Sequence, residues 1–276
     1  MKKILEIKNL SIEYFLENRN ILALQNINID LFENEIIGII GESASGKSTL
    51  GLAIISLLDK GAKISNGIIL FENENLLNKK EKELQKIRGK KISIIFQDPF
   101  SSLNPTMKIG KQILEAIDVN PSKEKVFSLL KDVGIQDEKL RYSQYPHQIS
   151  GGMRQRVMIA IAIASYPKII IADEPTTSLD TTYQLQIIDL LKNINKKYKS
   201  SIIFISHNIA LVSNIAKKLY IMNSGKIIEE GFSNDILENA KHPYTKLLLN
   251  SLFKIDKNER IKKPKKWIKP SSVVKI

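Results

Sequence analysis

The sequence contains no cysteine, so its 276 residues form no disulfide, no thiolate zinc site and no iron–sulfur cluster. This composition fits a reducing compartment. No apolar run approaches the roughly 18 to 20 residues that a membrane-spanning helix needs. Basic residues open the chain, but Glu6 and Lys8 interrupt the next apolar stretch, so we expect no signal peptide. Internal repeats are also absent, and the length suits one large domain or two modest ones.

Acidic residues are the minority, with 29 Asp and Glu against 42 Lys and Arg, a net charge of +13. Such an excess is typical of nucleic-acid binding. Here it reflects a chain rich in Lys throughout, and residues 254–276 alone hold nine basic residues against Asp256 and Glu259. We therefore expect no nucleic-acid partner. The segment Lys262–Trp267 is either a contact with an anionic membrane surface or a solvated terminus.

A phosphate-binding loop follows the first short apolar run. Ile36–Ile40 predicts a buried strand, residues 41–49 read Gly-Glu-Ser-Ala-Ser-Gly-Lys-Ser-Thr, and a helix is expected at about 47–58. The glycines let successive N–H groups point at one anion, which the helix dipole also favours. Lys47 would neutralise the β- and γ-phosphates, and Ser48 would bind Mg²⁺. The predicted nucleotide contacts are Gly41, Glu42, Ser43, Ala44, Ser45, Gly46, Lys47, Ser48 and Thr49.

A second glycine pair lies about a hundred residues further along the chain. The sequence Ser-Gly-Gly-Met-Arg-Gln-Arg at 150–156 precedes the apolar run 157–164. Ser150 is a good helix N-cap, and the two glycines leave bare N–H groups for an anion. Alone, the pattern is equally typical of a capped core helix.

Paired carboxylates follow another apolar strand, at 168–172. An isolated Asp-Glu pair is usually a solvated turn or a helix cap, but beside a phosphate loop we favour catalysis. Asp173 would hold Mg²⁺ through water, and Glu174 would accept a proton from the attacking water. His207 follows the strand 201–205 in the same way, and we interpret it as a γ-phosphate contact rather than a structural histidine.

In motif order, and over nearly its whole length, the sequence resembles the ATP-binding subunits of ABC transporters. The resemblance implies that residues 41–49 are the Walker A loop and residues 150–155 the signature motif. Asp173 would then close Walker B, and Glu174 would be the catalytic carboxylate. Residues 178–180 would form the D-loop, and His207 would be the switch histidine.

The resemblance also implies roles for two residues outside these motifs. Gln97, in Ile-Phe-Gln-Asp-Pro at 95–99, corresponds to the Q-loop glutamine, which serves both catalysis and Mg²⁺. Tyr14 lies where an aromatic ring stacks on adenine, although its neighbour Phe15 is an alternative. The implied cofactors are ATP and Mg²⁺.

A dimer is a further implication of the resemblance. The signature and D-loop residues would close over the ATP of a second ATPase subunit arranged head to tail, and hydrolysis would reopen the pair. Binding energy that needs the γ-phosphate can drive such a cycle. The residues implied are Ser150, Gly151, Gly152, Met153, Gln155 and Asp180.

Several segments resemble the ATPases of bacterial oligopeptide, dipeptide and nickel importers. These are Phe96–Pro105, Tyr145–Gln148, Ser150–Arg156 and His242–Thr245. The likeness implies two transmembrane permease subunits, an extracytoplasmic solute-binding protein, and a peripheral location on the cytoplasmic face of the inner membrane. Permease helices would dock near residues 97–106, which could otherwise be only a turn-rich linker.

Three features depart from the family pattern. Met153 replaces a glutamine, as is common in this subclass. Asn208 follows the switch histidine where Asp is usual, so the charge that an aspartate would bring to the dimer interface is lost. The basic C-terminal tail lacks the cysteines of longer relatives, which removes a cluster-binding role and slightly favours nickel or a metal chelate as cargo.

Two other function classes use the same loop. A non-transport ABC ATPase acting on DNA or ribosomes usually carries a long coiled coil or two cassettes, for which the spacing from Gly46 to Ser150 has no room. A small-molecule kinase would not need the signature motif together with His207. We therefore favour the importer ATPase.

The motifs predict an α/β fold, a P-loop NTPase with a RecA-like core, an N-terminal antiparallel β subdomain and an inserted helical subdomain at about 97–150. We expect antiparallel strands over 4–33, a hairpin over 64–75 that turns at Ser65-Asn66-Gly67, and a late hairpin turn at 223–226. The predicted division is an ATP-binding domain at 1–240 and a short basic tail at 241–276.

Overall fold

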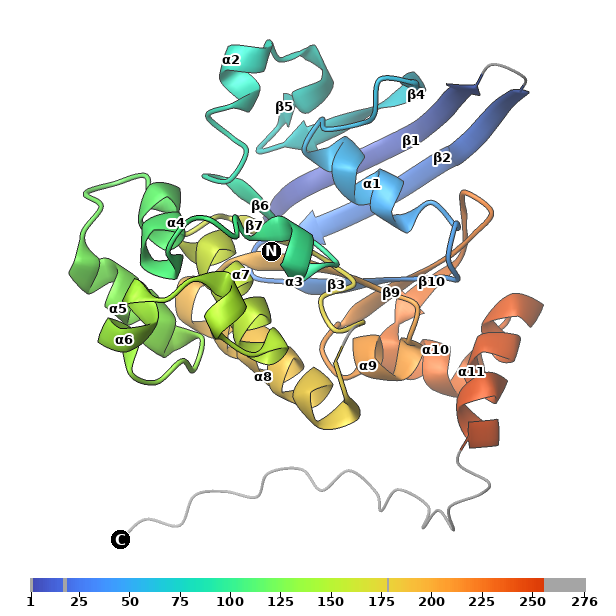
Figure 1. The fold of residues 1–276 in the computed structure, drawn as a ribbon. Coiled ribbons are helices and arrows are strands. Elements are labelled where there is room, and N and C mark those ends of the chain that lie inside the picture. Colours follow the sequence, from blue (N-terminus) through green and yellow to red (C-terminus); the bar gives the residue numbers. More distant parts are fainter. Residues whose placement is uncertain (1, 17–18, 178, 256–276) are drawn as a thin grey trace, which may run out of the picture.

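A computed structural model describes residues 2–16, 19–177 and 179–255. Its N-terminal strands form an antiparallel sheet in the order β2-β1-β4-β5. In this sheet β1 (Lys3–Leu16) lies between β2 (Arg19–Phe32) and β4 (Ala62–Phe71), and β4 pairs with the short β5 (Glu74–Asn75). The antiparallel subdomain expected at 4–33 is therefore present (Figure 1).

The predicted hairpin exists, but its turn was placed wrongly. Ser65-Asn66-Gly67 lies inside β4, where the pairing with β1 shifts register. Gly67 has φ of 100°, and a Cβ there would lie 2.5 Å from Leu10 Cα, so the glycine serves a bulge. The chain turns instead at Glu72 and Asn73, whose φ angles are 51° and 67°.

The central sheet has six strands in the order β10-β9-β3-β8-β7-β6, parallel except for the β9–β10 pair. The predicted turn at 223–226 joins that pair. The strands are β3 (Ile36–Ile40), β6 (Ile92–Ile95), β7 (Ile169–Asp173), β8 (Ser201–Ser206), β9 (Lys218–Asn223) and β10 (Lys226–Phe232).

Both faces of this sheet are covered, which explains its isoleucine-rich strands. Alternate residues of β3, such as Ile37 and Ile39, pack with α1 (Lys47–Ile54) and the antiparallel sheet. Ile36 and Ile40 pack on the other side, with α7 (Gly151–Ile163), α8 (Thr181–Tyr198) and α9 (Ile209–Ser213). Helix α1 is shorter than expected because Ser56, with φ of 53°, ends the helical path.

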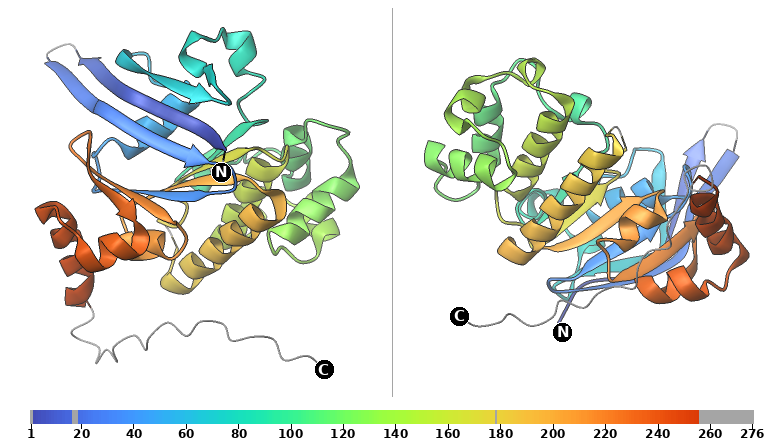
Figure 2. Two further views of the ribbon diagram at one scale, coloured as in Figure 1. Left: turned by 180° about the vertical axis from the view of Figure 1, so that it is seen from behind. Right: turned by 90° about the horizontal axis from the view of Figure 1, so that it is seen from below.

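The insertion between β6 and α7 is helical, as predicted, and stands to one side of the central sheet, away from the C-terminal helices (Figure 2). Its helices are α3 (Pro99–Ser102), α4 (Ile109–Ala116), α5 (Lys123–Asp132), α6 (Glu138–Ser143) and the 3₁₀ turn η2 (Pro146–Gln148). The short η1 (Leu76–Asn78) and α2 (Glu81–Leu84) follow the antiparallel sheet.

Two helices follow β10, namely α10 (Ser233–Asn239) and α11 (Pro243–Ile255). The first part of the expected tail is thus helical, and its Tyr244 and Leu249 pack against the core. The predicted membrane-surface segment Lys262–Trp267 lies outside the described residues. Among the helices described, none is long and apolar enough to cross a bilayer.

Candidate functional site

Two glycines without room for a side chain shape the loop between β3 and α1. A Cβ at Gly41 would lie 2.3 Å from the Met222 carbonyl oxygen, and one at Gly46 would lie 2.7 Å from the Ala23 carbonyl oxygen. Gly46 also has φ of 98°, a conformation that favours glycine, and it is the N-cap of α1. The strand, loop and helix that the motif predicts are therefore all present.

Lys47 is a cation held inside this loop, and it is only 4% exposed. Its Nζ donates to the Glu42 carbonyl oxygen at 2.7 Å and to Ser45 Oγ at 3.3 Å. Burial lowers the pKa of Lys47, while the carboxylates of Glu174 and Asp173 act in the opposite direction. An anion in the loop would stabilise the buried ammonium.

Ser48 and Asp173 bring a hydroxyl and a carboxylate together beside the loop. Ser48 Oγ donates to Asp173 Oδ1 at 3.2 Å. Asp173 is 8% exposed, and burial raises its pKa although the bond from Ser48 opposes the shift. A hard cation would offset the cost of burying this charge, and hydroxyl and carboxylate oxygens suit Mg²⁺. These residues therefore fit the predicted metal.

The Glu174 carboxylate is the point at which the three predicted catalytic residues meet. Gln97 Nε2 donates to Glu174 Oε2 at 3.3 Å, and His207 Nδ1 lies 3.4 Å from the same oxygen. These residues follow β6, β7 and β8, three adjacent parallel strands, and such carboxyl ends are where ligands bind in α/β sheets. Glu174 has φ of 47°, a left-handed conformation that is uncommon for non-glycine residues and that clusters at functional sites.

Thr177 was missed by the sequence analysis, although it contacts the same carboxylate. Its Oγ1 donates to Glu174 Oε2 at 2.7 Å. The one signal in the sequence is a hydroxyl three residues after the carboxylate, a spacing at which Ser and Thr often form local side-chain bonds. This bond holds the carboxylate close to its own strand end.

A cavity of about 220 Å³ joins the loop to the catalytic residues. Loop residues share this space with Gln97 and Glu174, two of the three predicted catalytic residues. Its lining residues are Ser43, Ala44, Gly46, Lys47, Ser48, Thr49, Gln97 and Glu174.

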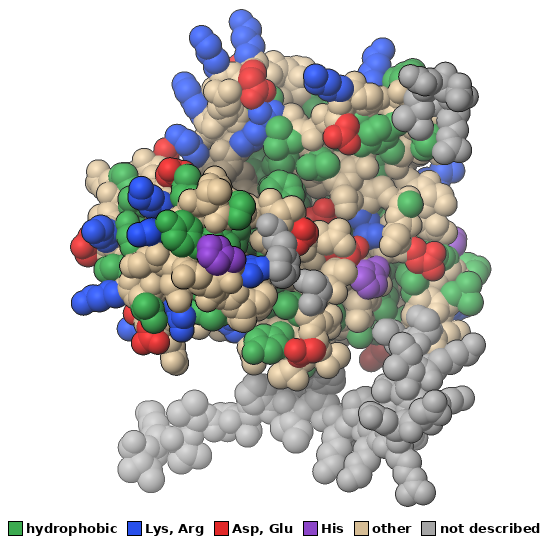
Figure 3. Space-filling model, in the orientation of Figure 1, with side chains coloured by type: hydrophobic (Ala, Val, Ile, Leu, Met, Phe, Trp, Pro, Cys, Tyr) green, Lys and Arg blue, Asp and Glu red, His purple; other side chains and the backbone are tan. Residues whose placement is uncertain are grey.

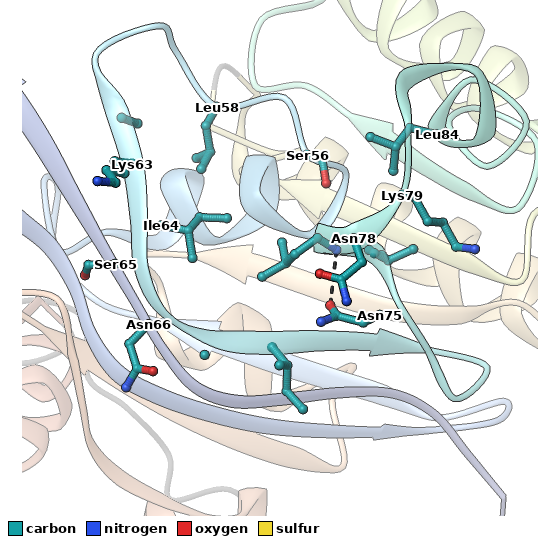
Figure 4. Close-up of a pocket in the computed structure, with 15 residues that line it drawn as sticks. Ser56, Leu58, Lys63, Ile64, Ser65, Asn66, Asn75, Asn78, Lys79 and Leu84 are labelled. Atoms are coloured by element: carbon teal, nitrogen blue, oxygen red, sulfur yellow. Dashed lines mark hydrogen bonds between the residues drawn. The ribbon is translucent and has the colours of Figure 1, made fainter.

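A larger cavity, of about 760 Å³, lies on the antiparallel subdomain between the end of α1, β4 and η1 (Figure 4). Asn75 Oδ1 accepts a hydrogen bond there from the Leu77 N–H at 3.1 Å and so caps η1. None of the described residues that line this cavity belongs to the predicted nucleotide motifs. Size alone therefore does not mark the candidate site, whereas convergent charged groups do.

The signature residues are not among the described residues that line the 220 Å³ cavity. Ser150 is exposed and caps α7, its Oγ accepting from the Met153 N–H at 3.3 Å. A Cβ at Gly151 would meet no described atom within 4 Å, whereas one at Gly152 would lie 3.3 Å from the Tyr183 ring. At the start of α7, space for an approaching group is thus available beside Gly151.

Gln155 is buried, and its role as a nucleotide contact stays a prediction. It is 1% exposed, because its position on α7 faces the chain's own core rather than the surface that carries Ser150. We therefore leave its side chain out of the proposed contact surface.

The D-loop adjoins the signature motif. Asp180 caps α8, its Oδ1 accepting from the Tyr183 N–H at 3.1 Å, and Tyr183 is also the ring that faces Gly152. The D-loop residue Ser178 lies outside the described residues. Asn208 caps α9, its Oδ1 accepting from the N–H groups of Ala210 and Leu211, so this departure from Asp retains a capping role.

Tyr14 lies on β1, opposite Ile21 of β2 and Ala62 of β4. It is half-buried and packs against the core, and the adjacent Phe15 is more exposed. Stacking on adenine remains a prediction for this pair.

The fold and the loop define the class, a P-loop NTPase, and comparison with known proteins gives the family. The family model described as "ABC transporter" matches residues 24–177, and the one described as "Oligopeptide/dipeptide transporter, C-terminal region" matches residues 228–276. The chain therefore belongs to the ABC transporter ATP-binding family, ATPases that power transport. This membership is incompatible with the small-molecule kinase considered above.

Curated relatives cover nearly the whole chain. The dipeptide transport ATP-binding protein DppD of Lactococcus lactis subsp. cremoris is 44% identical over 262 residues, which are 92% of this chain and 75% of that protein. The oligopeptide transport ATP-binding protein OppD of Bacillus subtilis is 45% identical over 257 residues, which are 91% of this chain and 72% of that protein.

Solved structures show the same fold. The dimeric bacterial ABC transporter cassette MJ0796 has a TM-score of 0.74 at 28% identity, over 83% of this chain and 99% of that one. CbiO1 from Clostridium perfringens, part of the ABC transporter complex cbiONQ, has a TM-score of 0.75 at 27% identity, over 92% and 99% of the two chains.

Proposed function

We propose that this chain is the ATPase subunit of a peptide importer, and that ATP-driven closure of a dimer and hydrolysis-driven reopening power the transport. The observation that carries the proposal is the meeting of Gln97, Glu174 and His207 beside the Lys47 loop. The matched C-terminal region and the dipeptide and oligopeptide transport relatives favour peptides as cargo over nickel or a metal chelate.

In the proposed mechanism the loop N–H groups and Lys47 hold the β- and γ-phosphates of ATP. Ser48, Asp173 and Gln97 hold Mg²⁺, which when bound neutralises negative charge on the phosphates. The Glu174 carboxylate orients a water molecule and takes its proton as the water oxygen bonds to the γ-phosphorus and the bond to ADP breaks. His207, beside Glu174, contacts the γ-phosphate.

The exposed start of α7 is the proposed dimer surface. Ser150 and Gly151 lie outside the chain's own phosphate cavity, and the space beside Gly151 leaves room for a partner's nucleotide. Bare N–H groups at a helix start suit a phosphate. The same surface includes Gly152, Met153 and the neighbouring Asp180, while the dimeric cassette MJ0796 offers a related example of pairing.

A groove of about 520 Å³ between the core and the inserted helices is the proposed permease contact. It is lined in part by Phe96 and Leu57, which are 42% and 44% exposed. Phe96 directly precedes Gln97, so a permease segment in this groove would lie next to the catalytic residues. Lys and Arg side chains gather over α2 and the turn after it, whose Arg88 and Lys90 line the groove (Figure 3).

The groove itself is balanced in charge, because Glu115 and Asp118 also line it, and Arg88 and Lys90 are paired with Glu81 and Asp118. The basic surface over α2, rather than the groove, suits the anionic headgroups of a membrane around the permeases. We therefore propose a peripheral position on the cytoplasmic face of the inner membrane, with two permeases, a second ATPase subunit and, through the permeases, an extracytoplasmic solute-binding protein.

Mass spectrometry of what co-purifies with the tagged chain from detergent-solubilised native membranes tests this proposal. We expect two permeases and a second ATPase, with permease recovery reduced at least about tenfold by Phe96→Glu because a charge would enter an apolar contact. The matched variant Phe232→Glu alters an exposed phenylalanine on β10 and should retain the permeases. Recovery of ribosomes or DNA without a permease would contradict the proposal. Uptake of labelled dipeptide and of nickel by the intact cells then distinguishes the two cargo classes.

A further inference from the structure

Tyr244, at the start of α11, contacts the phosphate loop from a point about two hundred residues further along the chain. Its hydroxyl oxygen accepts a hydrogen bond from the Glu42 N–H at 3.1 Å. The carbonyl oxygen of the same residue accepts from Lys47 Nζ at 2.7 Å. Glu42 therefore has Tyr244 on its N–H and the loop cation on its carbonyl.

The segment before α11 places this tyrosine. The Glu229 carboxylate, on β10, accepts from the Lys241 N–H at 2.6 Å and from the His242 N–H at 3.1 Å. His242 Nδ1 in turn accepts from the Tyr244 N–H at 3.1 Å. Pro243 lies between them at the first position of α11, where its fixed φ suits a helix start.

We infer that Tyr244 is a positioning residue for nucleotide binding, which it serves by fixing the first peptide groups of the phosphate loop. The inference rests on the proposed nucleotide site. A triphosphate in the loop competes with the Glu42 carbonyl for the Lys47 ammonium. While Lys47 exchanges the Glu42 carbonyl for a phosphate, the hydrogen bond from the Glu42 N–H to the Tyr244 hydroxyl keeps Glu42 oriented. The loop is therefore pre-organised before nucleotide binds.

Tyr244 is not one of the residues proposed to take part in ATP hydrolysis. Removing its hydroxyl group should therefore weaken ATP binding more than it slows turnover. In Tyr244→Phe the ring still packs against the core, and only the hydroxyl is lost. We expect the dissociation constant of the full-length chain for Mg·ATP, and its KM, to rise about three- to tenfold, the net value of one hydrogen bond. The kcat should stay within about twofold.

Tyr220→Phe is a matched control, since the Tyr220 hydroxyl also accepts a backbone N–H, that of Asp30, at 3.2 Å. Tyr220 lies on β9, outside the phosphate loop. The substitution Tyr220→Phe should lower the thermal stability of the protein without changing its affinity for nucleotide. Glu229→Ala, which frees the segment before α11, should weaken affinity in the same direction as Tyr244→Phe, and the double variant should be no weaker than about the worse single variant.

The measurement is titration of a fluorescent ATP analogue with competition by ATP, alongside steady-state ATPase kinetics. Unchanged affinity in Tyr244→Phe, or an equal change in Tyr220→Phe, would overturn the inference. Lys47→Ala is measured in parallel. If that variant binds nucleotide normally, the proposed site itself is wrong, and if it loses binding while Tyr244→Phe is normal, only the role of Tyr244 is wrong.

Discussion

The two predicted halves of the nucleotide site differ in what their polar groups contact. In the half that holds the phosphate loop, Lys47 and Ser48 already bond to oxygen atoms beside the 220 Å³ cavity. In the signature half, Ser150 and Asp180 make only the hydrogen bonds that cap their own helices among the contacts described, and Gly151 adjoins open space. The first half is therefore assembled by contacts between distant segments of the chain, whereas the second presents exposed residues at the starts of two helices.

The variant expected to have the largest effect is Glu174→Gln, in the half that holds the phosphate loop. Turnover should fall about a thousandfold because the amide cannot accept the proton of water. General base catalysis typically accelerates a reaction about 10²- to 10⁴-fold. Binding of ATP should persist, and ATP should trap a dimer because repulsion between the side chain and the γ-phosphate falls.

Single-turnover hydrolysis and size-exclusion chromatography with ATP provide the measurements for this variant. Glu238→Gln, which removes a carboxylate on the exposed side of α10, should behave as the native protein does. Turnover at the native rate in Glu174→Gln would remove Glu174 as the base.

Lys47→Ala should have the next largest effect, this time on binding. We expect nucleotide affinity to fall about a hundredfold, because charge-assisted bonds to the phosphates are lost. Isothermal titration of the purified chain measures the affinity, with Lys111→Ala on α4 as the matched control. Undiminished affinity would mean that the loop does not bind the phosphates.

Gly151→Ala tests the signature half of the site, which is exposed. The added methyl meets no described atom of the chain, so folding and nucleotide affinity of the monomer should not change. ATPase activity that depends on the dimer should fall about tenfold, because the methyl would crowd a partner's phosphate.

Gly231→Ala adds the same methyl on β10, 3.3 Å from the end of the flexible Ile236 side chain and outside the predicted nucleotide motifs, and should keep full activity. The dependence of ATPase rate on protein concentration is the measurement. Native activity in Gly151→Ala would contradict a close approach at this position.

Much of the fold could be predicted from sequence because local patterns carried it. The apolar runs at β3, β7 and β8, each followed by a polar motif, predicted three strands of the central sheet and the edge at which Glu174 and His207 lie. Gln97 was predicted from the family resemblance alone, because the short strand β6 before it was not recognised. The hairpin turn was misplaced because a glycine with positive φ serves a bulge as well as a turn, and the sequence around Gly67 does not distinguish them.

The contacts that escaped prediction depend on packing between distant segments or on side-chain direction. Tyr244 contacts Glu42 only because α11 packs beside the start of the loop. No local sequence pattern predicts that these two distant segments lie next to each other. The burial of Gln155 follows from how α7 is rotated against the core. Thr177 could have been predicted from its position three residues after Glu174. Ser and Thr residues at such short distances from a polar side chain are common in turns, however, so the pattern is not specific.

The segments that support the phosphate loop lie far beyond it in the sequence, in β8, β9 and the turn at Gly225. Although the loop begins at residue 41, β3 pairs with β8 and β9, and the Gly225 N–H donates to the Ser45 carbonyl oxygen at 3.1 Å. Long-range contacts of this kind form late and slowly. During synthesis the Walker A sequence is therefore made well before the strands that support it, and the loop gains these contacts only after residues up to Gly225 have been added.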